Sequence, residues 1–197
     1  MRYFLIALVI SACPATPGLD GGRLHTSRGV SLHWAQDRFP IPVVIHPGMP
    51  QRFKDAARTG ADIWEGAVGL KVFRVYEGSD SFHMFNGGPP HRGYVSIEGA
   101  KDLGFRGPLR IRGLAEVHQH LGAPGERGEI HSTHVFFLLD RYSDEDAVAL
   151  AVHELGHCLG LAHDMRDEGS IMWLSARPEA YFQPEDILYV RDSIQPP

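Results

Sequence analysis

Three histidines and one glutamate have the types and spacing that a catalytic metal site requires. Residues 153–164 read HELGHCLGLAHD, which contains the pattern HExxHxxGxxH. His153 and His157 are four residues apart, so on a helix both imidazoles leave the same face and can reach one ion. Gly160 lacks a Cβ atom and can take a left-handed conformation, which turns the chain back so that His163 supplies a third nitrogen. Three neutral imidazoles with an open fourth position describe a catalytic zinc site.

Glu154 follows the first histidine, and its chemistry differs from that of the ligands. Its carboxylate lies too far round the helix to share that coordination direction, but it can reach a water molecule held by the ion, where a general base acts. Cys158 points to another side of the helix, so we expect a buried and unreactive thiol. Asp164 directly follows the third histidine. It either orients a ligand through a hydrogen bond or remains a surface carboxylate, and the sequence leaves both interpretations open.

The ligands need a buried helix that stops before the turn at Gly160. Ser143, with Asp146 three residues later, resembles a capping box, and Ala, Val and Leu dominate the residues that follow. We therefore predict the active-site helix from Ser143 to Leu159. A final helix is predicted from Pro184 to Ser193.

A second long helix is predicted for residues 51–68. Apolar and small residues recur there at spacings of three and four, which places them on one buried face. Gly69 stands where a helix commonly ends in a left-handed residue. The positions that should face the core are Phe53, Ala56, Ala57, Gly60, Ala61, Trp64 and Val68.

Strands dominate the rest of the chain. Five segments are rich in β-branched and aromatic residues and are separated by Gly, Pro and charged loops. They are residues 41–46, 70–76, 93–98, 111–118 and 130–139. Strand, helix, strands, helix and a short tail with its own helix describe a mixed α/β (α+β) domain with a five-stranded sheet. We find no internal repeat, so we expect one domain over residues 31–197.

The ligand motif resembles that of the metzincin zinc peptidases, in which HExxHxxGxxH is followed by a Met-turn. Ser170-Ile171-Met172 lies at the matching place, with Met172 nine residues after His163. Within that clan the chain is most similar to bacterial matrixin-type peptidases. The resemblance implies an upper part over residues 31–163, a small C-terminal part over residues 164–197, and an apolar floor made by Met172 beneath the metal. Without the resemblance, Met172 would be an ordinary core residue.

The resemblance also implies an activity. A matrixin-like protein would be a zinc-dependent endopeptidase that hydrolyses peptide bonds through a metal-activated water, with Glu154 as general base and one catalytic zinc ion. An extended substrate would pair with an edge strand, expected within His131–Leu139, and Trp173–Ala176 would shape the pocket beside the cleaved bond. Calcium is not indicated, because the Asp- and Gly-rich calcium loops of animal matrixins are missing.

Two other functions are compatible with the same zinc motif. One is a lipoprotein that holds zinc and binds a partner without turnover, although pure binding has no need of Glu154. The other is a narrow exopeptidase or amidase, because the same zinc chemistry cleaves any amide that fits. A second, structural metal site is not predicted, since the remaining candidate ligands show no tight spacing. These are His83, His91, His118, His120, His131 and His134.

The N-terminus has the pattern of an export signal. Residues 1–12 place one Arg before a short apolar run that closes on small residues, too short to cross a membrane as a helix. Ile10-Ser11-Ala12-Cys13 resembles a bacterial lipobox, which implies lipidation of Cys13 and a lipoprotein of the bacterial cell envelope. The alternative is a secreted protein cut near Ala15. Residues 13–30 read as a tether of Pro, Gly and Thr.

Composition restricts the classes of molecule that the protein is expected to bind. The 197 residues carry a net charge of −5 without a run of Lys or Arg, which makes nucleic acid an unsuitable partner. Two cysteines cannot build a disulfide scaffold. We expect a peptide or protein substrate, with contact to a membrane only through the lipid anchor. The oligomeric state does not follow from the sequence.

Overall fold

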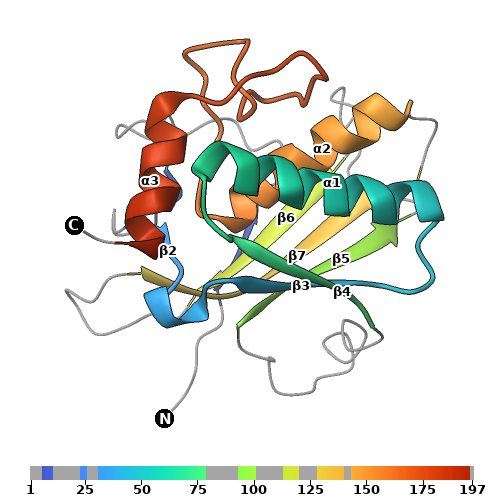
Figure 1. Cartoon of the computed structure of the whole chain (residues 1–197), viewed down its shortest axis with the longest axis horizontal. Helices are drawn as coiled ribbons and strands as arrows, with labels where there is room; N and C mark the ends of the chain where they lie inside the picture. Colours follow the sequence, from blue (N-terminus) through green and yellow to red (C-terminus); the bar gives the residue numbers. More distant parts are fainter. Residues whose placement is uncertain are drawn as a thin grey trace.

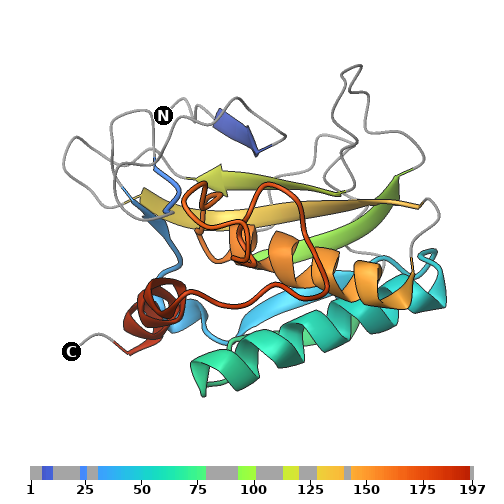
Figure 2. The same ribbon diagram turned by 90° about the horizontal axis from the view of Figure 1, so that it is seen from above.

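The computed structural model describes residues 6–10, 23–25, 31–78, 93–100, 113–119, 128–139 and 143–195. One sheet carries two long helices on the same face, and a shorter helix lies at one end (Figure 1, Figure 2). The strands are β1 (Ile6–Ile10), β2 (Leu32–His33), β3 (Ile41–Ile45), β4 (Phe73–Glu77), β5 (Tyr94–Ala100), β6 (Gly113–Gln119) and β7 (Gly128–Leu138). The helices are α1 (Gln51–Val68), α2 (Asp144–Cys158) and α3 (Pro184–Ile194), and a 3-10 turn covers Gln36–Arg38. None of the helices in this described part is both long and apolar enough to span a membrane.

The sheet runs in the order β1-β6-β7-β5-β3-β4, and β2 pairs with β7 outside that path. β4, β3, β5 and β7 are parallel neighbours, whereas β6 runs antiparallel to β7. All five predicted strands are present, so the mixed α/β class is confirmed. β4 begins at Phe73 rather than at residue 70, because Gly69, with a φ of 74°, caps α1 and the next three residues lead from the helix to the sheet.

The strand that precedes α2 is not an edge strand, so the expectation of a substrate edge within His131–Leu139 is wrong. β7 lies between β5 and β6, and Val135 pairs with Ile97 on one side and Ala115 on the other. The antiparallel strand β6 lies outside β7. The composition of a strand indicates how deeply it is buried, but it does not show which strands flank it, and this is why the position of the edge was missed.

The outer side of β6 is covered by β1, which lies within the residues that we assign to an export signal. The two strands are antiparallel, and Ile10 pairs with Ala115. β1 and the two-residue β2 are the strands that the sequence did not predict. Cleavage of the chain after residue 12 would remove β1 and leave β6 as the edge of the sheet.

Part of the expected tether also lies on the domain. Leu24 is buried, its N–H donates to the carbonyl of Gly160 at 2.8 Å, and its own carbonyl accepts from the N–H of Leu32 at 2.8 Å. The guanidinium of Arg23 lies 4.6 Å from the centre of the Tyr189 ring in α3. The packed part of the chain therefore includes residues 23–25, ahead of the expected start at residue 31.

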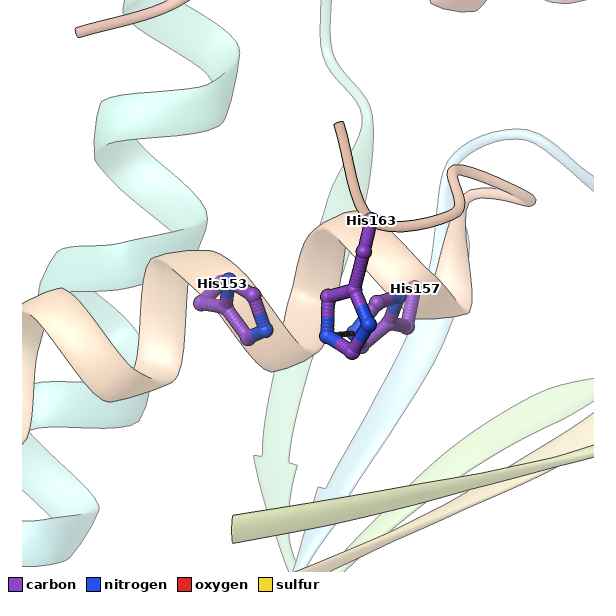
Figure 3. A group of neighbouring side chains, drawn as sticks. All are labelled: His153, His157 and His163. Atoms are coloured by element: carbon purple, nitrogen blue, oxygen red, sulfur yellow. Dashed lines mark hydrogen bonds between the residues drawn. The ribbon is translucent and has the colours of Figure 1, made fainter. Parts of the chain in front are cut away.

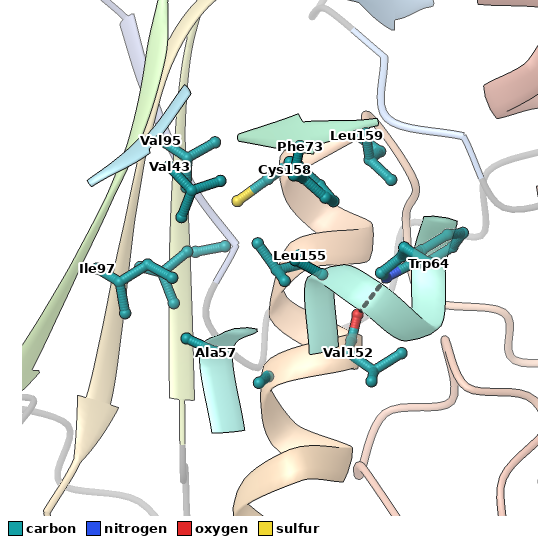
Figure 4. Close-up of a cluster of buried hydrophobic side chains, with 14 of the residues drawn as sticks. Val43, Ala57, Trp64, Phe73, Val95, Ile97, Val152, Leu155, Cys158 and Leu159 are labelled. Carbon is teal, nitrogen blue, oxygen red and sulfur yellow. Dashed lines mark hydrogen bonds between the residues drawn. The ribbon is translucent and has the colours of Figure 1, made fainter. Parts of the chain in front are cut away.

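The core lies between the sheet and the two long helices. All seven positions predicted to face the core on α1 are buried. The helices come closest at Gly60, where a Cβ atom would lie 3.1 Å from both the Cβ of Ala151 and the nitrogen of Val152. On the other side of α2, Leu155 faces Val43, Val95 and Ile97 of the sheet (Figure 4).

Two buried tryptophans hold α2 by its backbone. The indole N–H of Trp64 donates to the carbonyl of Val152 at 2.8 Å (Figure 4), and that of Trp34 donates to the carbonyl of Cys158 at 2.6 Å. Both side chains are buried. A buried donor that loses its acceptor is costly, so these bonds resist any displacement of α2 along its axis.

Trp64→Phe should destabilise the protein by about 2–4 kcal/mol, because it removes the bond to Val152 and leaves a cavity between the two helices. The free energy of unfolding in urea measures the loss. Trp173→Phe is the matched control, since Trp173 is only half-buried and lies in a loop. Equal losses in both variants would contradict the anchoring role of Trp64.

Candidate metal centre

The three predicted ligands lie together at the C-terminal end of α2. His153 and His157 project from the helix, and His163 reaches over them from the segment that follows (Figure 3). Their candidate ligand atoms all lie within 4.8 Å of one another, and the Nε2 atoms of His157 and His163 are 3.2 Å apart. Two nitrogens bound tetrahedrally to one zinc ion at ~2.0–2.1 Å are separated by about 3.3 Å. The spacing of this pair therefore suits zinc.

Backbone carbonyls orient the two helical ligands. The Nδ1 atom of His153 lies 2.7 Å from the carbonyl oxygen of Ile171, and the Nδ1 atom of His157 lies 2.8 Å from that of Leu161. A carbonyl oxygen can only accept, so each Nδ1 carries the proton and each Nε2 keeps its lone pair for a metal.

The surroundings keep all three imidazoles neutral. Burial lowers the pKa of His153, although its bond to Ile171 opposes the shift. Burial also holds the pKa of His157 well below its ordinary value, and the neighbouring His153 and His163 lower it further. Burial, followed by the charge of His153, lowers the pKa of His163 to about 4. Because a metal binds neutral imidazole, the cluster is ready for a cation at neutral pH.

Gly160 makes the turn that brings the third ligand back. Its φ is 94°, in the left-handed region, and a Cβ atom there would lie 2.5 Å from the carbonyl oxygen of Leu32. The N–H of Leu161 donates to the carbonyl of Gly156 at 3.1 Å, which closes the end of the helix. Both the backbone conformation and the available space thus require glycine.

Met172 packs against α2 on the turn between the two helical ligands. It is fully buried, and its side chain fills the space that a Cβ atom of Gly156 would occupy. The N–H of Met172 donates to the hydroxyl oxygen of Ser170 at 3.1 Å, and its carbonyl accepts from the N–H of Asp164 at 2.8 Å. Met172 is therefore an apolar residue packed against the helical turn that carries His153 and His157.

Glu154 is buried beside the ligands, with 4% of its surface exposed. Burial raises the pKa of its carboxyl from the ordinary 4.5 to about 8. Its Oε2 atom is buried and bonds no other group in the described part of the chain. In the metal-free chain this burial favours the protonated carboxyl at neutral pH, whereas a cation held by the three histidines would favour the carboxylate.

Asp164 and Cys158 do not contact the ligand rings through hydrogen bonds in the described residues. The carboxylate of Asp164 accepts from the Nε and Nη2 atoms of Arg166 at 2.8 and 2.9 Å, and these bonds lower its pKa. The N–H of Arg166 also donates to Oδ1 of Asp164 at 3.0 Å, and Asp164 is buried, so it is not the surface carboxylate of the second interpretation. Burial raises the pKa of the Cys158 thiol to about 12. The thiol therefore stays protonated at neutral pH, in agreement with the expected lack of reactivity.

The other candidate histidines do not form a second cluster within the described residues. His134 is on β7, and its Nδ1 atom lies 2.7 Å from the hydroxyl of Ser96 on the neighbouring strand β5. His131 is on β7 as well. His83, His91 and His120, together with the side chain of His118, lie outside the residues that the structure describes.

Two hydrogen bonds to Asp167, together called the Asp167 clasp, were not predicted from the sequence. Its Oδ2 atom accepts from the hydroxyl of Tyr181 at 2.5 Å and from the Nε2 of Gln183 at 2.7 Å. The carbonyl of Tyr181 in turn accepts from the N–H of Ile171 at 2.8 Å. The clasp joins the two ends of the loop over residues 168–182. This loop carries the carbonyl of Ile171, which orients His153. Its partners are 14 and 16 residues from Asp167 in the chain, and no local pattern reveals a contact of that kind.

Comparison with known proteins identifies relatives of this chain. The family model described as matrixin matches residues 52–191. Stromelysin-1 of Mus musculus is 25% identical over 151 residues, and stromelysin-1 of Rattus norvegicus is 24% identical over 151 residues. Each match covers 76% of this chain and 29% of the relative. The chain thus spans less than a third of the length of these relatives.

The zinc site can be tested by binding. One equivalent of zinc should bind the metal-free chain and stabilise it by about 4 kcal/mol when the free zinc is 1,000 times its Kd. His163→Ala should weaken binding by at least tenfold, because it removes one of three nitrogens. Isothermal titration and the melting temperature measure both effects, and His33→Ala serves as a control. Equal zinc affinity in the two variants would contradict the ligand role of His163.

Asp186 of α3 is a second buried carboxyl group, outside the histidine cluster. It is 3% exposed, and its Oδ2 atom has no hydrogen-bond partner in the described part of the chain. Burial, followed by the negative charges of Asp164 and Glu185, raises its pKa from 3.8 to about 7. The folded chain therefore holds a proton on Asp186 in a pH range where the unfolded chain has released it.

This linkage predicts how stability depends on pH. A carboxyl with a higher pKa in the folded chain stabilises it at low pH, and the contribution is lost as the pH rises toward about 7. Asp186→Asn cannot ionise, so the variant should lose less stability between pH 5 and pH 8, by up to about 3 kcal/mol. Urea unfolding of both metal-free proteins at the two pH values measures the difference. Parallel pH profiles would show that Asp186 is already ionised at pH 5.

Proposed function

Since the chain belongs to the matrixin family, we propose that it is a zinc-dependent endopeptidase that hydrolyses internal peptide bonds of extended substrates. The observation that carries the proposal is the combination of three neutral imidazoles around one point with the buried carboxyl of Glu154 directly beside them. A site that only held zinc would have no use for a buried carboxyl directly beside the ligands. This favours the enzyme over a binding protein.

The residues divide the chemistry between them. His153, His157 and His163 would hold one zinc ion by their Nε2 atoms, and Met172 would close the site from below. When bound, zinc supplies a Lewis acid that polarises the substrate carbonyl and lowers the pKa of a water molecule. Glu154 takes the proton of the attacking water on its carboxylate and returns a proton to the leaving amine nitrogen.

An extended substrate would pair with β6. β6 lies outside β7 and begins at Gly113, next to Glu154. A peptide added to this edge would cross the N-terminal end of β6 beside the ligand cluster, and its backbone would bond to the strand. The residues from Trp173 to Ala176 follow Met172 and would shape the pocket next to the cleaved bond. Occupation of the same edge by β1 leads us to expect that substrate access requires removal of the N-terminal segment.

The proposed activity predicts that substitution of Glu154 lowers the rate of peptide cleavage. With one equivalent of zinc, the chain lacking residues 1–12 should make internal cuts in an unfolded protein, detected by mass spectrometry of the fragments. Glu154→Ala should lower the rate by at least about 100-fold, because a general base contributes 10²–10⁴-fold, while zinc still binds. Glu145→Ala is the matched control, as Glu145 is exposed on the first turn of the same helix.

The alternatives give different results in that experiment. Removal of residues only from the ends of peptides would indicate an exopeptidase, and cleavage of small amides alone would indicate an amidase. Stoichiometric zinc without any cleavage would favour a zinc-holding binding protein. Equal rates in Glu154→Ala and Glu145→Ala would contradict the proposed base.

We also propose that the protein is exported and carries lipid on Cys13, after cleavage that removes residues 1–12. The support is the sequence Ile10-Ser11-Ala12-Cys13 behind a short apolar run. Such an anchor would hold the enzyme at a surface of the bacterial envelope, with the segment before Arg23 as spacer.

Lipidation has a direct test. Expression in a bacterium with labelled palmitate should label the parent protein, and Cys13→Ser should abolish the label and release the protein from membranes. Cys158→Ser is the control and should keep the label, because that thiol is fully buried. A labelled Cys13→Ser variant would contradict the proposal, and an unlabelled parent cut near Ala15 would indicate a secreted protein.

A further inference from the structure

Gly113 begins β6 and faces the helix that carries the ligands. A Cβ atom at this position would lie 2.8 Å from Cδ1 of Leu150 and 2.9 Å from Cδ of Glu154, and closer still to the Oε1 atom of Glu154. Carbon atoms that are not bonded pack at 3.5–4.0 Å. The carboxyl group of Glu154 therefore occupies the space that any other residue at position 113 would need for its side chain.

The backbone gives no other reason for glycine at this position. Among the described residues, the glycines with positive φ are Gly69, Gly93 and Gly160. Gly113 has an ordinary strand conformation that every L-residue can adopt. Glycine weakens a strand interior, and there it often marks a place where another group approaches closely. At Gly113 the approaching group is the carboxyl of Glu154.

Neither the backbone of β6 nor that of α2 can move away from this contact without breaking other bonds. β6 is held by its pairing with β7, where Gly113 lies opposite Phe137. α2 is fixed by the bonds from Trp34 and Trp64 to its backbone. An added methyl group would therefore have to displace side chains, and the Glu154 carboxyl would be displaced most, because it makes the closest contact and two of the three.

We propose that Gly113 is a positioning residue, whose missing side chain forms the recess that sets the place of the Glu154 carboxyl group. The consequence for catalysis rests on the proposed function of Glu154 as general base. Gly113 also lies on the strand that would pair with an extended substrate, so one residue connects the substrate strand to the group that transfers the proton. Any larger residue at position 113 would displace that group from the cleaved bond.

The test is a double-mutant cycle of Gly113→Ala and Glu154→Ala, performed on the zinc-loaded protein. Gly113→Ala should lower the melting temperature by about 3–6 °C, as overpacking does. In the Glu154→Ala background the same substitution should lower it far less, because the carboxyl is gone. Gly99→Ala is the matched control in β5, on the far side of β7, where the added Cβ would crowd the Cδ1, Cγ and Cδ2 atoms of Leu139 instead of Glu154. It should show no such coupling to position 154.

Activity provides the second measurement. Gly113→Ala should lower kcat on the order of 10- to 100-fold through misplacement of the base, with KM and zinc affinity changed by less than about threefold. Equal loss of stability in both backgrounds, or an unchanged kcat in an active enzyme, would overturn the proposal. If the parent protein cleaves nothing, the proposed function fails, whereas the stability cycle still decides whether the recess at Gly113 holds Glu154.

Discussion

The position of α2 against the sheet is the constraint on which the rest of the site depends. Its ligand-bearing residues are buried on all sides, so the helix cannot slide or rotate without breaking contacts in the core. Two tryptophans from distant parts of the chain donate to its carbonyls, one near each end of the ligand turn. This rigidity gives His153 and His157 fixed directions before any metal binds, and a preorganised site loses little freedom on binding.

The segments after α2 complete the site through backbone contacts. Gly160 reverses the chain in a conformation that other residues avoid, and the N-terminal segment around Leu24 and Leu32 packs against that reversal. The loop that follows returns to the helix, and its carbonyl at Ile171 fixes the ring of His153. The Asp167 clasp keeps this loop closed. The three candidate ligands thus depend on parts of the chain that lie far from them in sequence.

The sequence predicted those features that arise from local pattern. Spacing alone placed His153, His157 and His163 at one point, and periodicity identified the buried positions of α1 apart from Lys54. It could not show the order of strands, because pairing is decided by contacts between distant segments, and β7 was mistaken for an edge. The recess at Gly113 and the partners of Asp167 were missed for the same reason. A glycine that makes room for a distant carboxyl looks, in the sequence, like any other glycine in a strand.

The proposed catalytic zinc centre requires three histidine nitrogens that hold zinc and leave its fourth position to solvent or substrate. X-ray absorption at the zinc K-edge, on the chain loaded with one equivalent of zinc, tests this most directly. It should show three imidazole nitrogens and one oxygen from solvent at ~2.0–2.1 Å, without sulfur. Sulfur in the first coordination sphere, or a fourth protein ligand that closes the site, would contradict a catalytic zinc centre in this protein.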